Sequence, residues 1–155
     1  MKEIERRILR LPAVKSVSVS RKWPNTVSIK VAERERVYQR LEGNIFQWVD
    51  EDGYIFYSQS QSADGAISVV TEGTDQRLLS DVAVVVQAIP ESWASRVQRI
   101  EALSPDMITI VLDQGQDIFW GSATDSELKA EVTTALLNVK ATHFDVSSPG
   151  NPTSR

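Results

Sequence analysis

The segment from residue 14 to residue 33 constrains the fold most, because two alternating stretches flank one short turn. Val17 and Val19 alternate with serines, and apolar residues alternate with polar ones again from Val27 to Val31. A period of two is typical of a strand with one buried face. The intervening Trp23–Thr26 contains a proline that presets the first central position of a turn and an asparagine that tolerates the second. The sequence therefore predicts a β-hairpin whose apolar face and free edge both need cover.

A helical pattern precedes this hairpin. Ile4, Ile8 and Leu11 lie four and three residues apart, on one stripe of a helix. Pro12 ends the pattern, because its ring fixes φ and the residue before a proline avoids the helical region. We expect residues 1–35 to form a small open unit of one helix and one hairpin.

Beyond residue 35, longer strands are interspersed with two helices. Helical spacing of apolar residues predicts a helix over residues 78–89, which Pro90 ends. The same spacing predicts a second helix over residues 128–139, after a capping-box pattern at Thr124–Glu127. Asp50–Gly53 reads as a hairpin turn, since Gly supplies positive φ at no steric cost. The expected strands are 37–41, 45–49, 54–57, 67–70, 97–103, 107–112, 118–120 and 143–146.

The fold class predicted from these elements is α+β. It consists of the helix-plus-hairpin unit at 1–35, a mostly antiparallel β domain with two helices at 36–148, and an irregular tail at 149–155.

Charge and composition exclude several functions. Lys and Arg total 17 against 21 Asp and Glu, and this net charge of -4 opposes a nucleic-acid role, because phosphate binding needs a concentrated positive field. Two basic clusters stand among glutamates and indicate solvated mixed faces; they are Arg6, Arg7 and Arg10, and Arg34, Arg36 and Arg40.

The residue types that usually carry covalent or metal chemistry are scarce. There is no cysteine, which excludes disulfides, thiolate metal sites and a cysteine nucleophile. His143 is the one histidine, so a zinc site built from several histidines is excluded and no metal is expected. No phosphate-binding loop or dinucleotide fingerprint exists, and no cofactor is expected. The longest apolar run, Val82–Val86, is too short to span a bilayer, so the chain as given is predicted to be soluble.

Two constellations resemble catalytic or metal sites and fail on spacing. Asp50–Asp52 is a dense acidic cluster, but Ile55 stands where a calcium loop needs Gly, so a solvated turn is favoured. His143, Asp145 and Ser147 share one strand face, yet residues two apart stand roughly 6.5 Å apart along a strand, too far for a relay. We predict no catalytic residue.

The four tryptophans can be hot spots of a binding surface or pieces of a core. Burial is the favoured interpretation for Trp23, Trp48, Trp93 and Trp120, because aromatic side chains mostly serve burial. At the turn, the ring of Trp23 is expected to fold over the adjacent sheet as a lid.

A family resemblance covers nearly the whole chain. Leu11–Val14 followed by Val19–Arg34 resembles the end of a POTRA domain of the FtsQ/DivIB family, with its R-x-W-P-x-T hairpin and closing E-R pair. Trp48–Phe56 resembles the V-D-x-x-G hairpin of that family, and Phe144–Val146 resembles its last strand. The structural motif residues carried over are Pro12, Arg21, Trp23, Pro24, Glu33, Arg34, Asp50, Gly53, Gly121 and Lys129. The first strand and helix of a POTRA domain are absent, so residues 1–35 are expected to be a partial one.

The resemblance implies a non-catalytic scaffold of the cell-division machinery at the septum. It implies a single-pass membrane protein with this region outside the cytoplasm, its tether absent here, and other divisome proteins as partners, notably an FtsB/FtsL-type coiled-coil pair. Partner binding is expected at the edge of the last strand, at His143, Phe144, Asp145, Val146, Ser147 and Ser148. Pro149 and Pro152 cannot donate ladder hydrogen bonds, so no later strand is expected to cover that edge.

Two other functions stay open from the sequence. One is a POTRA-containing scaffold for envelope transport or outer-membrane assembly, which predicts further POTRA copies or a barrel in the full gene. The other is a small hydrolase using His143 or the acidic turn, which predicts a deep pocket with convergent titratable groups.

Overall fold

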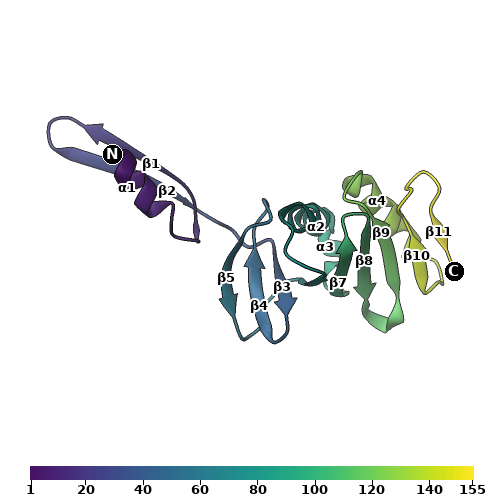
Figure 1. Cartoon of the computed structure of the whole chain (residues 1–155). Helices are drawn as coiled ribbons and strands as arrows, with labels where there is room; N and C mark the ends of the chain where they lie inside the picture. Colours follow the sequence, from purple (N-terminus) through teal and green to yellow (C-terminus); the bar gives the residue numbers. More distant parts are fainter.

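The computed structural model describes all residues from 1 to 155. Its first unit is helix α1 (Lys2–Ile8) lying beside the hairpin of β1 (Val14–Lys22) and β2 (Thr26–Glu33), as Figure 1 shows. The hairpin register opposes Val19 to Ile29, so the apolar residues of both strands share one face, as the alternation predicts.

This apolar face has little cover. No residue of helix α1 is itself buried, although its Glu5 carboxylate accepts a hydrogen bond from the Val19 N–H at 3.0 Å. Ile29 and Val31 are each 47% exposed and Val27 is 54% exposed. Val14 and Val19 are buried, so the hairpin has only part of the second layer that its pattern calls for.

Trp23 does not fold back over the sheet. Its side chain is 85% exposed, so the prediction of a buried, lid-like ring is wrong for this tryptophan. The physical reason is its position: the turn lies at the far end of the hairpin from the rest of the chain, where no second layer is within reach (Figure 1). The burial prediction is confirmed for Trp93 and Trp120, while Trp48 is half-buried.

The rest of the chain builds a nine-stranded sheet in the order β11-β10-β9-β8-β7-β6-β3-β4-β5 (Figure 1). Three neighbouring pairs are parallel (β3 with β6, β6 with β7, β9 with β10) and the others are antiparallel. The strands are β3 (Tyr38–Glu42), β4 (Ile45–Val49), β5 (Ile55–Gln59), β6 (Ser68–Thr71), β7 (Val97–Ser104), β8 (Met107–Leu112), β9 (Asp117–Gly121), β10 (His143–Asp145) and β11 (Thr153–Ser154). The helices are α2 (Gln76–Ala88), α3 (Glu91–Ala94) and α4 (Ser126–Leu136), with a short 3-10 turn at Asp113–Gly115.

One row of opposed residues runs across the sheet and forms the centre of the core. It crosses five strands in register, from Val69 through Ile100, Ile110 and Ile118 to Phe144, and every member is fully buried. Helices α2 and α4 contribute to the same cluster of 21 buried residues. The α+β class and the mostly antiparallel sheet are confirmed.

No helix has both the length and the apolar character needed to cross a membrane.

Candidate functional site

The C-terminal end of the sheet differs from the sequence prediction. Strand β10 pairs with β9 on one side and with β11 on the other, so the expected open edge is covered at His143–Asp145. The His143 and Arg155 backbones exchange two hydrogen bonds, at 2.9 and 3.0 Å. The prediction of an irregular tail at 149–155 is wrong for Thr153 and Ser154, which form β11.

The two prolines permit this return because they stand in the reversal and not in the ladder. Asn151 N–H donates to the Ser148 carbonyl at 2.9 Å, which closes the turn Ser148–Asn151 with Pro149 inside it and Pro152 just after it. The residues after Pro152 carry backbone N–H groups, unlike proline, and they pair with β10. Both prolines lack a backbone donor, as expected, but they stand where the ladder needs none.

Side chains of the expected docking segment alternate between the core and the other face of the sheet. Phe144 and Val146 are fully buried, and the Val146 N–H already donates to the Phe119 carbonyl at 3.0 Å. His143, Asp145 and Ser147 are half-buried, and Ser148 is exposed. Phe144 and Val146 are therefore core residues, and their side chains cannot contact a partner in this conformation.

Of the residues that superficially form a triad, Ser147 and Asp145 contact each other, contrary to the spacing argument, whereas His143 has a different partner. His143 Nδ1 lies 2.6 Å from Asp117 Oδ2, across the parallel pair of β10 and β9. Ser147 donates through both N–H and Oγ to Asp145 Oδ1, at 3.0 and 2.7 Å. The structure thus does not join histidine, aspartate and serine into one relay. Asp117 was not singled out from the sequence, because it lies 26 positions before His143.

Gly121 and Lys129 both lie near the entry to α4. A Cβ on Gly121 would lie 2.9 Å from the Ser147 Cβ, and its φ is +73°, so this position requires glycine. Lys129 is almost completely buried and donates to the Ser122 carbonyl at 2.8 Å. Burial lowers the pKa of the Lys129 ammonium. Both motif residues therefore fix the path from β9 into α4, beside the C-terminal edge.

A second group of motif residues joins the hairpin to the sheet. Arg34, just after β2, places its guanidinium 2.5 Å from Asp50 Oδ2 and 4.3 Å from the centre of the Tyr54 ring. The Asp50 side chain is only 2% exposed. Its other oxygen accepts the N–H groups of Asp52 and Tyr54, at 3.0 and 2.8 Å. The carboxylate that the sequence analysis placed in a solvated turn is instead a buried ion-pair partner.

The same turn is held from its other side. Lys15 of β1 forms ion pairs with Glu51 and Asp52. Gly53 lies so close to the start of α2 that a Cβ there would approach the Gln76 carbonyl oxygen to 2.6 Å. The turn at 50–53 therefore contacts β1, Arg34 just after β2, and the start of α2. Of the ten motif residues, Pro12, Arg21, Trp23, Pro24 and Glu33 do not join either group and lie along the first unit.

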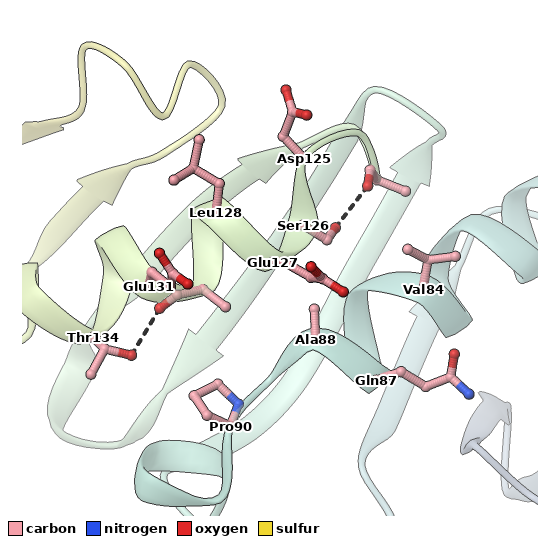
Figure 2. A pocket seen from close by; sticks show the side chains of 12 residues that line it. Val84, Gln87, Ala88, Pro90, Asp125, Ser126, Glu127, Leu128, Glu131 and Thr134 are labelled. Carbon is pink, nitrogen blue, oxygen red and sulfur yellow. Dashed lines mark hydrogen bonds between the residues drawn. The ribbon is translucent and has the colours of Figure 1, made fainter.

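A groove of about 1060 Å³ runs between α2 and α4. Its walls carry Val84 and Ala88 of α2 facing Glu127 of α4 (Figure 2). Ser126 and Thr134 hydroxyls donate to the carbonyls of Ala123 and Ala130, both at 2.8 Å, so these hydroxyls are used within the fold. No group of three or more His, Asp and Glu side chains is placed to hold a metal ion.

Comparison with known proteins identifies both parts of the chain. The profile "POTRA domain, FtsQ-type" matches residues 1–34, and "Cell division protein FtsQ/DivIB, C-terminal" matches residues 37–147.

Individual relatives are similar along nearly the whole chain. The cell division protein FtsQ of Streptomyces venezuelae is 35% identical over 163 residues, which covers 97% of this chain and 60% of the relative. FtsQ of Streptomyces collinus is 34% identical and FtsQ of Corynebacterium glutamicum is 30% identical, with 63% and 68% of their lengths covered. This chain thus spans about 60% of the length of the first of these relatives.

A solved structure is similar in fold. The major extracytoplasmic domain of the division protein DivIB from Geobacillus stearothermophilus superimposes with a TM-score of 0.53 at 14% identity, over 70% of this chain and 99% of that domain. Together with the profile over residues 37–147, these matches establish that the chain belongs to the FtsQ/DivIB family of cell division proteins.

Proposed function

We propose that this chain is the extracytoplasmic part of a membrane-anchored division protein that serves the divisome as a binding scaffold. One observation carries the proposal: the FtsQ/DivIB C-terminal profile covers residues 37–147, the body of a sheet that ends in a short edge strand. Partners would dock by adding a strand to that edge, a mode in which backbone hydrogen bonds supply the affinity. An FtsB/FtsL-type coiled-coil pair is the partner we propose.

The docking edge in this proposal is β11 and not β10. His143 and Arg155 exchange both of their backbone hydrogen bonds. In an antiparallel pair the next residue along the strand then directs its N–H and C=O away from the neighbouring strand. For β11 that residue is Ser154, which pairs with Phe144 without using these groups. Of the segment His143–Ser148, residues His143–Asp145 would lie one strand behind the edge and hold β11 in register.

The experiment compares Ser154→Pro with Ser154→Ala in binding to a purified coiled-coil pair. Ser154→Pro removes the outward N–H, and we expect affinity to fall by about tenfold or more. Ser154→Ala keeps the N–H and should stay within about threefold of the parent chain. Equal affinity of both variants would exclude β11 as the docking strand.

A chain ending at Ser148 gives a second readout. If partners add to β11, this truncation abolishes binding. If β11 instead occupies the place of a partner strand on β10, truncation strengthens binding, and the docking edge is β10 after all.

A further inference from the structure

The two parts of the chain carry opposite charge. Residues 1–35 hold nine basic and four acidic side chains, whereas residues 36–155 hold eight basic and seventeen acidic ones. The contrast is sharpest in the hairpin, where residues 14–32 contain four cations and no carboxylate; these cations are Lys15, Arg21, Lys22 and Lys30. A positive field of this kind attracts anions, although the whole chain has a net charge of -4.

Three of the four cations are free for a partner. Lys15 forms ion pairs with the turn at 50–53, at the base of the hairpin. Arg21, Lys22 and Lys30 take part in no ion pair within the chain. Arg21 and Lys22 stand at the end of β1, directly before the turn. The free positive charge is therefore concentrated toward the tip of the hairpin.

The tip also presents the most exposed large apolar side chain of the molecule. Trp23 is 85% exposed, and Val27, opposite Arg21 in the register, is 54% exposed. Figure 1 shows the turn projecting at the far end of the hairpin, away from the nine-stranded sheet. A flat surface can reach this tip without touching the acidic sheet domain.

We propose that the hairpin tip, Arg21–Val27, is a contact site for an anionic phospholipid surface. An exposed indole beside cations suits the membrane interface, where the ring sits at headgroup level and the cations meet lipid phosphates. The acidic sheet domain is repelled by the same surface, so the charge contrast orients the molecule with its tip toward the lipid.

A lipid surface fits the tip better than an acidic protein segment does. The hollows of about 1060 Å³ and about 570 Å³ are not lined by any tip residue. A convex tip with one large ring offers no groove to position a peptide, whereas insertion into headgroups needs none. Binding of an acidic segment is kept as an outcome of the test.

The experiment uses the absence of cysteine, which lets a single introduced thiol carry an environment-sensitive nitrobenzoxadiazole label. The label is placed at Asn25→Cys in the tip or, as a control, at Gln61→Cys in an exposed loop of the sheet domain. Both chains are titrated with vesicles of phosphatidylglycerol and phosphatidylcholine, and with vesicles of phosphatidylcholine alone. We expect the fluorescence emission of the tip label to shift to the blue with the mixed vesicles and not with phosphatidylcholine alone. The control label should show no shift, and the shift of the tip label should be lost at high salt.

Matched charge variants then test the residues. Arg21→Gln with Lys22→Gln should weaken binding to the mixed vesicles by about 25-fold, since each cation near such a surface contributes about fivefold. Arg77→Gln with Lys140→Gln removes the same charge from the sheet domain and should change affinity by less than about twofold. Trp23→Ala should keep the charge dependence and reduce the blue shift of the tip label.

Three results would overturn the proposal. The first is equal binding to both kinds of vesicle, and the second is equal weakening by the two charge pairs. The third is that a poly-glutamate peptide binds the chain as tightly as the mixed vesicles do, while the vesicles cause no blue shift of the tip label. That result would assign the tip to an acidic protein segment.

Discussion

The hairpin unit and the sheet domain share one sequence pattern and differ in what covers it. In the sheet domain, alternating residues are fully buried under α2 and α4, within a cluster of 21 side chains. In the hairpin, Val14 and Val19 alone are buried, and Ile29, opposite Val19 on β2, stays 47% exposed. The comparison teaches that a period of two assigns residues to a face, while burial depends on a second layer from elsewhere in the chain.

The contact between the two regions is polar, unlike the apolar interior of the sheet domain. Its polar contacts include the Arg34–Asp50 pair, the Tyr54 ring and the ion pairs of Lys15. A polar junction of this kind couples the regions through geometry and charge, with little apolar burial. Its strength decides whether the hairpin and the sheet domain behave as one body.

The largest expected effect comes from the core of the sheet domain. Phe144→Ala removes a fully buried ring and should lower the free energy of unfolding by about 3–5 kcal/mol. Ile29→Ala in the hairpin, where the side chain is half exposed, should cost less than about 1 kcal/mol. Urea unfolding followed by circular dichroism measures both. Equal losses would mean that the hairpin face is covered in solution, which would remove the contrast.

The next effect concerns the junction. Asp50→Ala leaves the Arg34 guanidinium and two N–H groups without their acceptor, and should lower the free energy of unfolding by about 3 kcal/mol. Asp52→Ala is the matched control and should cost less than about 1 kcal/mol, because its side chain is exposed. A double-mutant cycle with Arg34→Ala measures the coupling; additive losses would show that the pair does not join the two regions.

A smaller effect follows from the buried amine of Lys129. Because burial lowers its pKa below the ordinary 10.5, the folded chain holds this proton less tightly than the unfolded chain. Its contribution to stability therefore rises as pH increases from the lowered pKa to 10.5, and is flat below that window. Lys129→Met should change stability at neutral pH by no more than about 1 kcal/mol and remove the rise. Unfolding at a series of pH values checks this, and an unchanged rise in the variant would assign it to another group.

The smallest effect is expected at the hairpin tip. Trp23→Ala should leave the melting temperature unchanged, because an exposed ring loses almost no packing on truncation. Thermal unfolding by circular dichroism is the measurement, with Trp120→Ala as the buried counterpart that should unfold at much lower temperature. A large loss for Trp23→Ala would indicate that its ring packs against something in solution.

Local signals gave the elements of this fold with good accuracy. The hairpin turn and strands at 14–33, the helix stopped by Pro90 and the row of apolar strands all appear where periodicity places them. The predicted capping box at the start of α4 does not form. The helix begins at Ser126, and the preceding Asp125 has a φ of +56° and makes no side-chain capping hydrogen bond. The path there is determined by burial of Trp120 and Lys129, which donate to Ser126 and Ser122.

By itself, the sequence determined the α+β class, the period of each strand, the family motifs and the opposite charges of the two regions. The class and the strand periods follow from the backbone preferences of neighbouring residues, and the charges follow from composition, so none of them requires knowledge of distant contacts. Only the tertiary structure decided that Asp50 is buried against Arg34, that the tail returns as β11 over β10, and that Trp23 stays exposed. Each of these depends on which distant segments meet, and such contacts leave no periodic signal along the chain.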